Sequence, residues 1–157
     1  MNVLLLMVGK TEEVYLKEGI LIFEKRLRHY VNYQTIFIPS LKNTKHFTPD
    51  EFKSKEGDEI LKQTAKADYI VILDEKGKSF RSVEFAGFLQ QQMNSGSKNL
   101  MFIVGGAYGF SDKVYAIADL KISFSEMTFS HQMIRLFFTE QLYRAFTILK
   151  NEAYHNE

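Results

Sequence analysis

The residues from Leu100 to Arg135 decide the fold that this sequence predicts. They begin with a continuous apolar run at 100–104 and pass directly into Gly105-Gly106-Ala107-Tyr108-Gly109. A second short run at 120–124 leads into Ser125-Glu126-Met127-Thr128-Phe129, and an apolar helix follows. In an open α/β sheet, ligands bind in the crevice beyond the carboxyl ends of the strands. We therefore expect these two loops to hold a small-molecule cofactor.

The rest of the chain alternates between segments typical of strands and segments typical of helices. Strands are expected at 2–8, 33–38, 69–73, 100–104 and 120–124, and helices at 12–30, 49–66, 82–96, 112–118 and 130–150. Short continuous apolar runs indicate strands that are buried on both faces, as in parallel sheets. The pattern therefore predicts one α/β domain over residues 1–157, with a mostly parallel sheet flanked by helices.

Local signals mark where several of these elements begin. Thr11, Ser111 and Ser130 are candidate caps of the helices that follow them. Thr48-Pro49-Asp50-Glu51 combines a capping residue, a proline and an acid at the spacing of a helix start. The segment Leu73-Asp74-Glu75-Lys76-Gly77 predicts a charged turn after the third strand.

The composition excludes several classes of site. There is no cysteine, which removes disulfides, thiolate metal sites and cysteine nucleophiles. The four histidines show no ligand spacing, so we expect no metal. No apolar run reaches the roughly 18 to 20 residues of a membrane helix and no signal peptide is evident, so we expect a cytoplasmic protein with no membrane partner. A net charge of +1 neither requires nor excludes a nucleic-acid partner.

Two familiar nucleotide-binding motifs fail on their spacing. Gly9-Lys10-Thr11 and Gly77-Lys78-Ser79 match the end of a phosphate-binding loop, but Leu4 and Ile72 stand where its first glycine is needed. A dinucleotide fingerprint fails because its first glycine would fall on Val104. Adjacent glycines after a buried strand still favour close approach to a ligand over a turn that only needs positive φ.

A few polar side chains near the carboxyl terminus remain open to more than one interpretation. His131 and Arg135 lie four residues apart on one helix face, either as a surface pair or as part of a site. Glu140 and Arg144 are most simply an ion pair at the same spacing. The pair Tyr154-His155 follows the last helix, in a tail that is either disordered or docked at a site across a dimer interface.

The last helix is apolar over more of its circumference than one core-facing stripe requires. Its apolar residues are Met133, Ile134, Leu136, Phe137, Phe138, Leu142, Tyr143, Ala145, Phe146, Ile148 and Leu149. A terminal helix of a small domain rarely buries so many side chains within one chain. We therefore expect a homodimer that uses this helix.

Together these segments resemble the RlmH-type ribosomal RNA methyltransferases of the SPOUT class. The resemblance rests on Met7-Val8-Gly9-Lys10, Leu73-Asp74 with Gly77-Lys78, 103–109, 123–129, His131-Gln132 to Arg135, 140–145 and Tyr154-His155. It covers essentially the whole chain in order. The Gly-Gly turn alone is common, whereas the Met-Thr-Phe loop followed by His, Arg, the Glu-Gln-x-Tyr-Arg-Ala helix and Tyr-His is highly specific. Ser130 departs from the pattern, since relatives often carry proline there.

The resemblance implies a fold and an activity that the spacing does not show. The fold is an α/β domain with a C-terminal trefoil knot, and the enzyme is a homodimer. The activity is transfer of a methyl group from S-adenosyl-L-methionine to ring nitrogen 3 of a pseudouridine in 23S ribosomal RNA of the assembled ribosome. Carried over by position, the cofactor would touch Leu73, Gly105, Phe124, Ser125, Glu126, Met127, Thr128 and Phe129. Gly105 and Gly106 are expected to leave room for it.

Methyl transfer needs the ring nitrogen in line with the methyl carbon, and it needs the nitrogen's proton removed. The candidates for these roles are His131, Arg135, Tyr154 and His155, and we favour Tyr154 and His155 supplied across the dimer. Arg135 and Arg144 are candidate contacts to RNA phosphate or another anion. A basic rim is expected at Lys42, Lys45, Lys76, Lys78, Arg81 and Arg135.

Three other functions fit parts of the sequence. The first is a SPOUT methyltransferase that acts on another RNA base. The second is a non-catalytic ribosome-binding module that retains a vestigial cofactor loop. The third is a flavodoxin-like phosphate binder.

Overall fold

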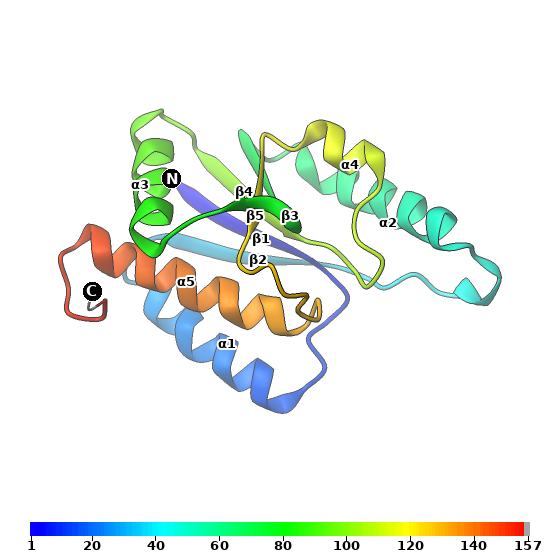
Figure 1. Cartoon of the computed structure of the whole chain (residues 1–157), viewed down its shortest axis with the longest axis horizontal. Helices are drawn as coiled ribbons and strands as arrows, with labels where there is room; N and C mark the ends of the chain where they lie inside the picture. Colours follow the sequence, from blue (N-terminus) through cyan, green and yellow to red (C-terminus); the bar gives the residue numbers. More distant parts are fainter. Residues whose placement is uncertain (156–157) are drawn as a thin grey trace.

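A parallel sheet forms the centre of the molecule in the computed structural model, which describes residues 1–155 (Figure 1). Its strands are β1 (Asn2–Val8), β2 (Asn32–Ile38), β3 (Tyr69–Ser79), β4 (Asn99–Val104) and β5 (Leu120–Ser123). The five strands lie in the order β2-β1-β4-β3-β5, and every neighbouring pair is parallel. The predicted α/β architecture with a mostly parallel sheet is confirmed.

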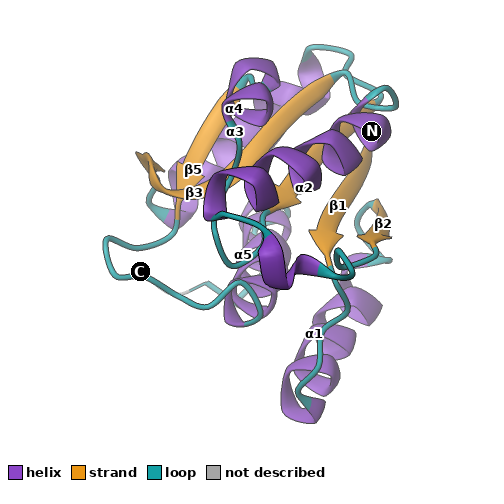
Figure 2. Cartoon of the chain, turned by 90° about the vertical axis from the view of Figure 1, so that its right-hand side faces the viewer, coloured by secondary structure: helices purple, strands orange, loops and turns teal. Residues whose placement is uncertain are grey.

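Helices cover both faces of this sheet (Figure 2). The helices α1 (Val14–Leu27), α3 (Ser82–Asn94) and α5 (Met133–Leu149) lie on one face. The helices α2 (Pro49–Thr64) and α4 (Asp112–Ile117) lie on the other. Because side chains alternate along a strand, each central strand contributes to two cores. On β1, Val3, Leu5 and Met7 pack in the first core, and Leu4, Leu6 and Val8 pack in the second.

The structure confirms some of the predicted helix caps and contradicts others. The capping box of α2 is confirmed: the Thr48 hydroxyl accepts from the Glu51 N–H at 3.2 Å, and the Glu51 carboxylate accepts from the Thr48 N–H at 2.8 Å. Thr11 does not cap α1, which begins at Val14, because its hydroxyl is buried and accepts a hydrogen bond from Arg135. Ser130 accepts from the N–H of Met133, where α5 begins.

Ser111 precedes α4 as expected, but its hydroxyl makes no capping bond to that helix. The helix α2 packs against it closely. A Cβ on Gly57 would lie 2.2 Å from the Ser111 oxygen, so only glycine fits at that point of α2.

The charged turn predicted at 73–77 is wrong. The strand β3 continues to Ser79 and pairs with β5 on both sides of an irregularity, so that Leu73 and Lys78 both lie opposite Ile122. A Cβ on Gly77 would lie 2.6 to 2.7 Å from backbone atoms of Lys121 and Ile122. We call residues 74–80 the strap, because this segment crosses the chain that leaves β5 (Figure 1). The charged composition of this segment does not indicate a strand. The strand forms because Gly77 lets its backbone approach β5 closely.

The last helix is covered within its own chain more completely than its sequence suggests. It lies on the sheet between α1 and α3, with Phe138 and Leu142 fully buried (Figure 1). Leu136 contacts Gly19 of α1, and Gln141 accepts a hydrogen bond from Ser82 of α3. Its apolar side chains are nevertheless not all buried, because Phe137 is 37% exposed and Met133, Ile134, Leu136, Tyr143, Ile148 and Leu149 are only partly buried. The homodimer itself stays a proposal.

No helix within residues 1–155 combines the length and the apolar character needed to cross a lipid bilayer. A short 3₁₀ helix, η1 (Thr44–His46), precedes α2 and projects away from the sheet with the start of that helix (Figure 1).

Candidate functional site

A cavity of about 790 Å³ opens at the carboxyl ends of β3, β4 and β5. Its walls come from the loop 105–109 after β4, the loop 124–131 after β5 and the first residues of the strap. This is the edge at which an open parallel sheet is expected to bind ligands. The volume falls within the range of small-molecule sites.

The structure brings most of the predicted cofactor residues together at this cavity. Its lining includes Leu73, Gly105, Phe124, Ser125, Met127, Thr128 and Phe129, whereas Glu126 is not among the lining residues. Val104, Ile122 and Ile134 add apolar surface that sequence reasoning did not assign to the site. Tyr108 and Phe110 also line it, and their position within or beside the Gly105–Gly109 loop was the signal that could have identified them.

The loop after β5 is held by its own hydroxyl groups. The Ser123 hydroxyl donates to the carbonyl of Ser125 at 2.8 Å, and the Ser125 hydroxyl accepts from the N–H of Met127 at 2.9 Å. The Thr128 hydroxyl donates to the Glu75 carboxylate of the strap at 2.8 Å. These bonds fix the loop against the strap, so the cavity has a defined wall before a ligand binds.

The glycine turn after β4 is held from behind by a buried carboxylate. The Gly106 N–H donates to Glu56 of α2 at 2.9 Å, and the Glu56 side chain is almost fully buried. A Cβ on Gly106 would lie 2.5 to 2.9 Å from that carboxylate, so Gly106 makes room for Glu56 and not for the ligand as expected. Burial raises the pKa of Glu56, against the opposing effect of the Gly106 hydrogen bond.

Two acidic side chains of the strap lie in the cavity wall. Asp74 accepts a hydrogen bond from the hydroxyl of Tyr115 and another from the N–H of Lys76 at 2.8 Å. Burial, and then the Asp74 carboxylate, raise the pKa of the Tyr115 hydroxyl, so Tyr115 remains a proton donor to Asp74. Asp74 and Glu75 thus place negative charge beside the cavity.

His131 lies in the cavity wall and is partly buried. Burial lowers the pKa of its imidazole, and the charge of Arg135 lowers it further, against an opposing effect of Glu12. The neutral form is therefore favoured, and a neutral imidazole can accept a proton from a ligand in the cavity.

Arg135 is fully buried and does not reach the cavity surface. Its guanidinium donates to the carbonyls of Val8 at 2.5 Å, Gly9 at 3.1 Å and His131 at 3.1 Å, and to the Thr11 hydroxyl at 3.1 Å. The expectation that Arg135 belongs to an exposed basic rim and contacts RNA phosphate is therefore wrong. Its hydrogen bonds tie the loop after β1 to the first turn of α5 and to the backbone of His131, which lies just before that helix.

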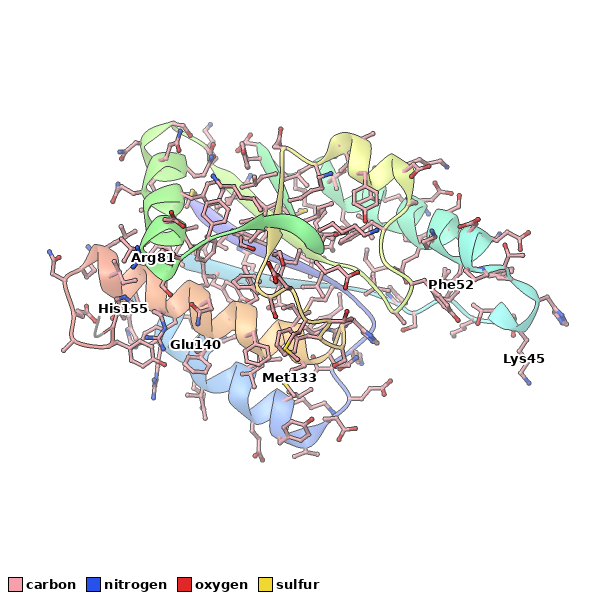
Figure 3. All side chains as sticks on the ribbon, in the orientation of Figure 1. Lys45, Phe52, Arg81, Met133, Glu140 and His155 are labelled. Carbon is pink, nitrogen blue, oxygen red and sulfur yellow. The ribbon has the colours of Figure 1, made fainter. Side chains whose placement is uncertain are left out.

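The tail pair Tyr154-His155 lies away from the cavity in its own chain. The Tyr154 hydroxyl donates to Glu140 at 3.2 Å, and its ring packs on Tyr143 and under the guanidinium of Arg144, at 4.8 Å and 4.7 Å between centres. Burial and the nearby Glu140 charge raise the pKa of Tyr154. Figure 3 shows His155 at the same end of α5, far from the start of that helix at Met133. The tail is thus docked on α5.

The predicted ion pair at this end of α5 is confirmed. Arg144 and Glu140 lie 2.6 Å apart, and Arg144 also donates to the carbonyl of Tyr154.

The remaining residues of the expected basic rim are separated in space. Lys76 lines the cavity. Lys53 of α2 lines it too, although the sequence did not predict a role for it. Lys45 is exposed in η1 and Lys42 is exposed just before it, while the Lys78 ammonium lies 4.8 Å from the centre of the Phe80 ring. Arg81 stands at the start of α3.

Within residues 1–155, no group of three or more His, Asp or Glu side chains is placed to hold a metal ion.

Comparisons with known proteins match this chain over its whole length. A family model described as "Predicted SPOUT methyltransferase" matches residues 1–155. A protein of Christiangramia forsetii named ribosomal RNA large subunit methyltransferase H is 53% identical over 156 residues, which cover 99% of each chain. A protein of the same name from Parabacteroides distasonis is 50% identical over the full length of both chains.

Solved structures show the same fold. A probable methyltransferase from Bordetella pertussis aligns with a TM-score of 0.57 over 92% of this chain and 94% of its own, at 9% identity. A probable methylase family protein from Haemophilus influenzae gives a TM-score of 0.57 over 96% of this chain and 66% of its own, also at 9% identity.

Proposed function

Because this chain belongs to the RlmH-type family of SPOUT methyltransferases, we propose that it methylates ring nitrogen 3 of a pseudouridine in 23S ribosomal RNA of the assembled ribosome. Its cofactor is S-adenosyl-L-methionine, the methyl donor of SPOUT methyltransferases. The trefoil knot of this fold family is implied for the segment where the strap crosses the chain leaving β5. The whole chain, on this proposal, is one catalytic domain of the cytoplasm, where ribosomes work.

One observation carries the proposal: the loop most specific to the family forms a wall of the cavity. The residues 123–131, apart from Glu126, surround the cavity together with the Gly105–Gly109 loop. Ser123 and Ser125 hold this loop through bonds to the Ser125 carbonyl and the Met127 N–H, and Thr128 ties it to the strap, so this wall of the cofactor site is formed before a ligand binds.

The cavity suits the chemistry of the donor. When bound, S-adenosyl-L-methionine supplies a methyl group activated by a positively charged sulfur. The apolar side chains of Leu73, Ile122 and Ile134 offer surface to its uncharged parts. The strap carboxylates Asp74 and Glu75 favour a cation by charge attraction, which is stronger beside buried groups than in bulk water.

The chain must also manage the proton on ring nitrogen 3. A new nitrogen–carbon bond forms as the methyl group leaves the donor sulfur, and the nitrogen's proton has to reach a base. Neutral His131 in the cavity wall is placed to accept it, and Arg135 positions His131 by holding the backbone of residue 131. Tyr154 and His155 of a second copy would orient the base and assist proton loss.

The position of the tail argues for that second copy. Tyr154 bonds to Glu140, which lies about 10 Å along α5 from Met133 at 1.5 Å per residue, and His131 precedes Met133 by two residues. Exposed apolar side chains on α1 (Tyr15 and Ile22) and on α5 (Phe137) supply a surface for a twofold dimer. Antiparallel packing of two α5 helices would bring the tail of one copy to the cavity of the other.

The deciding experiment is mass mapping of 23S ribosomal RNA from cells that lack this protein. The proposal expects one pseudouridine to lose a methyl group, and it expects purified protein with S-adenosyl-L-methionine to restore the mark on isolated ribosomes. Ribosomes carrying uridine at that position serve as the control and should gain no methyl group there.

Other results would favour the alternatives. Methylation of free transfer RNA, but not of ribosomes, would indicate a different RNA base. Binding to ribosomes with no calorimetric signal for S-adenosyl-L-methionine would indicate a non-catalytic module.

A further inference from the structure

A cluster of aromatic and basic side chains lies outside the cavity, on the arm formed by η1 and the start of α2. Lys45 and Phe52 mark this arm at the end of the molecule opposite the tail (Figure 3). The loop 105–109 reaches it from the cavity side, where Tyr108 contacts Phe52. The arm therefore continues directly from the mouth of the cavity.

Tyr108 presents an unusually exposed aromatic surface for a residue of a cavity wall. It is 56% exposed, yet its ring centre lies only 5.0 Å from that of Phe52 at an interplanar angle of 59°. Its loop is held by the Gly106 bond to buried Glu56. Tyr108 is thus a supported platform, with one side on Phe52 and further surface open at the cavity mouth.

The charges of the arm favour a polyanion. Lys42, Lys45 and Lys55 are exposed and form no ion pair with any described carboxylate of residues 1–155. The two acids of the arm offset only part of its positive charge, because Asp50 pairs with Lys53 at 3.1 Å, and Glu51 closes the capping box of α2 and also attracts Lys55. The ammonium of Lys55 also lies 5.0 Å from the centre of the Phe47 ring.

We propose that Tyr108 and Phe52, with Lys42, Lys45 and Lys55, form a stacking and phosphate-binding platform for single-stranded ribosomal RNA next to the methylated base. This inference rests on the proposed function and adds where the RNA strand lies. Single strands are bound by aromatic faces that stack on bases and by cations that follow the phosphates. A strand on the arm passes the cavity mouth, where a neighbouring base can enter toward His131.

The test measures fluorescence anisotropy of a labelled single-stranded RNA of about twelve nucleotides, without cofactor. Tyr108→Ala is expected to bind about tenfold more weakly, because a stacking surface is lost, while Tyr108→Phe keeps the ring and binds as the wild type does. The Lys42→Ala/Lys45→Ala double variant is expected to lower the slope of log affinity against log salt by about 1.4, for two lost phosphate contacts between roughly 50 and 200 mM salt.

The matched control is Lys66→Ala/Lys98→Ala. It makes the same charge change at two exposed lysines before β3 and β4, at the opposite edge of the sheet, and should leave the salt slope unchanged. The platform is overturned if Tyr108→Ala binds RNA as well as Tyr108→Phe. Equal salt slopes for the two double-lysine variants would overturn it as well. It is also overturned if the platform variants bind ribosomes more weakly but bind naked RNA as the wild type does, because that result indicates a protein partner.

Calorimetry with S-adenosyl-L-methionine separates this proposal from the proposed function. The Lys42→Ala/Lys45→Ala variant should bind the cofactor as the wild type does, which also shows that it is folded. If the wild type binds RNA through the platform but methylates no ribosome, the proposed function fails and the platform stands. If ribosomes are methylated but the RNA affinities of the variants match the wild type, the platform alone fails.

Discussion

The guanidinium of Arg135 joins three backbone carbonyls and one hydroxyl in the interior of the protein. Lysine keeps the charge but cannot form this planar fork, so Arg135→Lys leaves buried oxygens without donors. We expect the free energy of unfolding to fall by about 3 kcal/mol in urea titrations. Arg144→Lys, at a partly exposed ion pair, is the control and should cost less than about 1 kcal/mol. Similar losses in the two variants would contradict the structural role of Arg135.

The lowered pKa of His131 gives methyl transfer a defined pH dependence. A base works in its neutral form, so the rate should rise with pH and reach half of its maximum below the ordinary histidine pKa of 6.5. His131→Ala should lower the single-turnover rate on ribosomes by about 100-fold or more, with cofactor affinity measured separately by calorimetry. A half-maximal rate at a pH above 6.5, or the same pH profile in His131→Ala, would remove His131 from this role.

Glu56 links the glycine turn to pH through its raised pKa. The folded state holds the Glu56 proton more tightly than the unfolded state, so this group's contribution to stability is fully present at acid pH and declines as pH rises above 4.5. Glu56→Gln removes that dependence and keeps an oxygen for the Gly106 N–H. Its stability relative to the wild type should therefore increase with pH in urea titrations. Parallel pH curves for the two proteins would contradict the assignment.

At the scale of elements, the strap depends on glycine where it crosses β5. Gly77→Ala would place a Cβ within 2.7 Å of backbone atoms of Lys121 and Ile122, and backbone cannot move aside as a flexible side chain can. We expect a loss of about 2 to 3 kcal/mol in the free energy of unfolding, together with weaker cofactor binding, since the strap forms a cavity wall.

Gly87→Ala provides the matched control for the strap. Gly87 lies in α3 and is exposed, and no neighbouring atom lies within 4 Å of the position that a Cβ would take there. Because alanine favours the helix more than glycine does, this variant should gain about 0.5 to 1 kcal/mol. Equal effects of the two substitutions would show that the strap tolerates a side chain.

At the scale of the whole molecule, the proposed composite site can be tested by complementation. A Tyr154→Ala/His155→Ala variant and a His131→Ala variant should each be inactive alone. In an equal mixture about half of the dimers contain one copy of each variant. Each mixed dimer has one working site of two, made of the intact cavity of one copy and the intact tail of the other. Activity should therefore return to about a quarter of the wild-type level. Absence of recovery, in mixtures shown by light scattering to be dimeric, would mean that the tail acts within its own chain.

The sequence by itself determined the order of strands and helices, the parallel sheet, the capping box of α2 and the two loops that form the cavity. These features are encoded locally, because apolar runs, helix periods and capping residues act over a few positions. The loop of residues 124–129 was assigned through its resemblance to a family, and all of it except Glu126 lines the cavity.

Only the tertiary structure decided which side chains of these strands, helices and loops are buried and what they contact. Arg135 bonds to Val8, 127 residues away, and Glu56 bonds to Gly106, 50 residues away. A charged strap pairs as a strand because Gly77 allows close backbone approach to β5. The energy of such contacts depends on which surfaces packing brings together. Judged by charge and spacing alone, Arg135 therefore looked like a surface residue, and residues 74–77 looked like a turn.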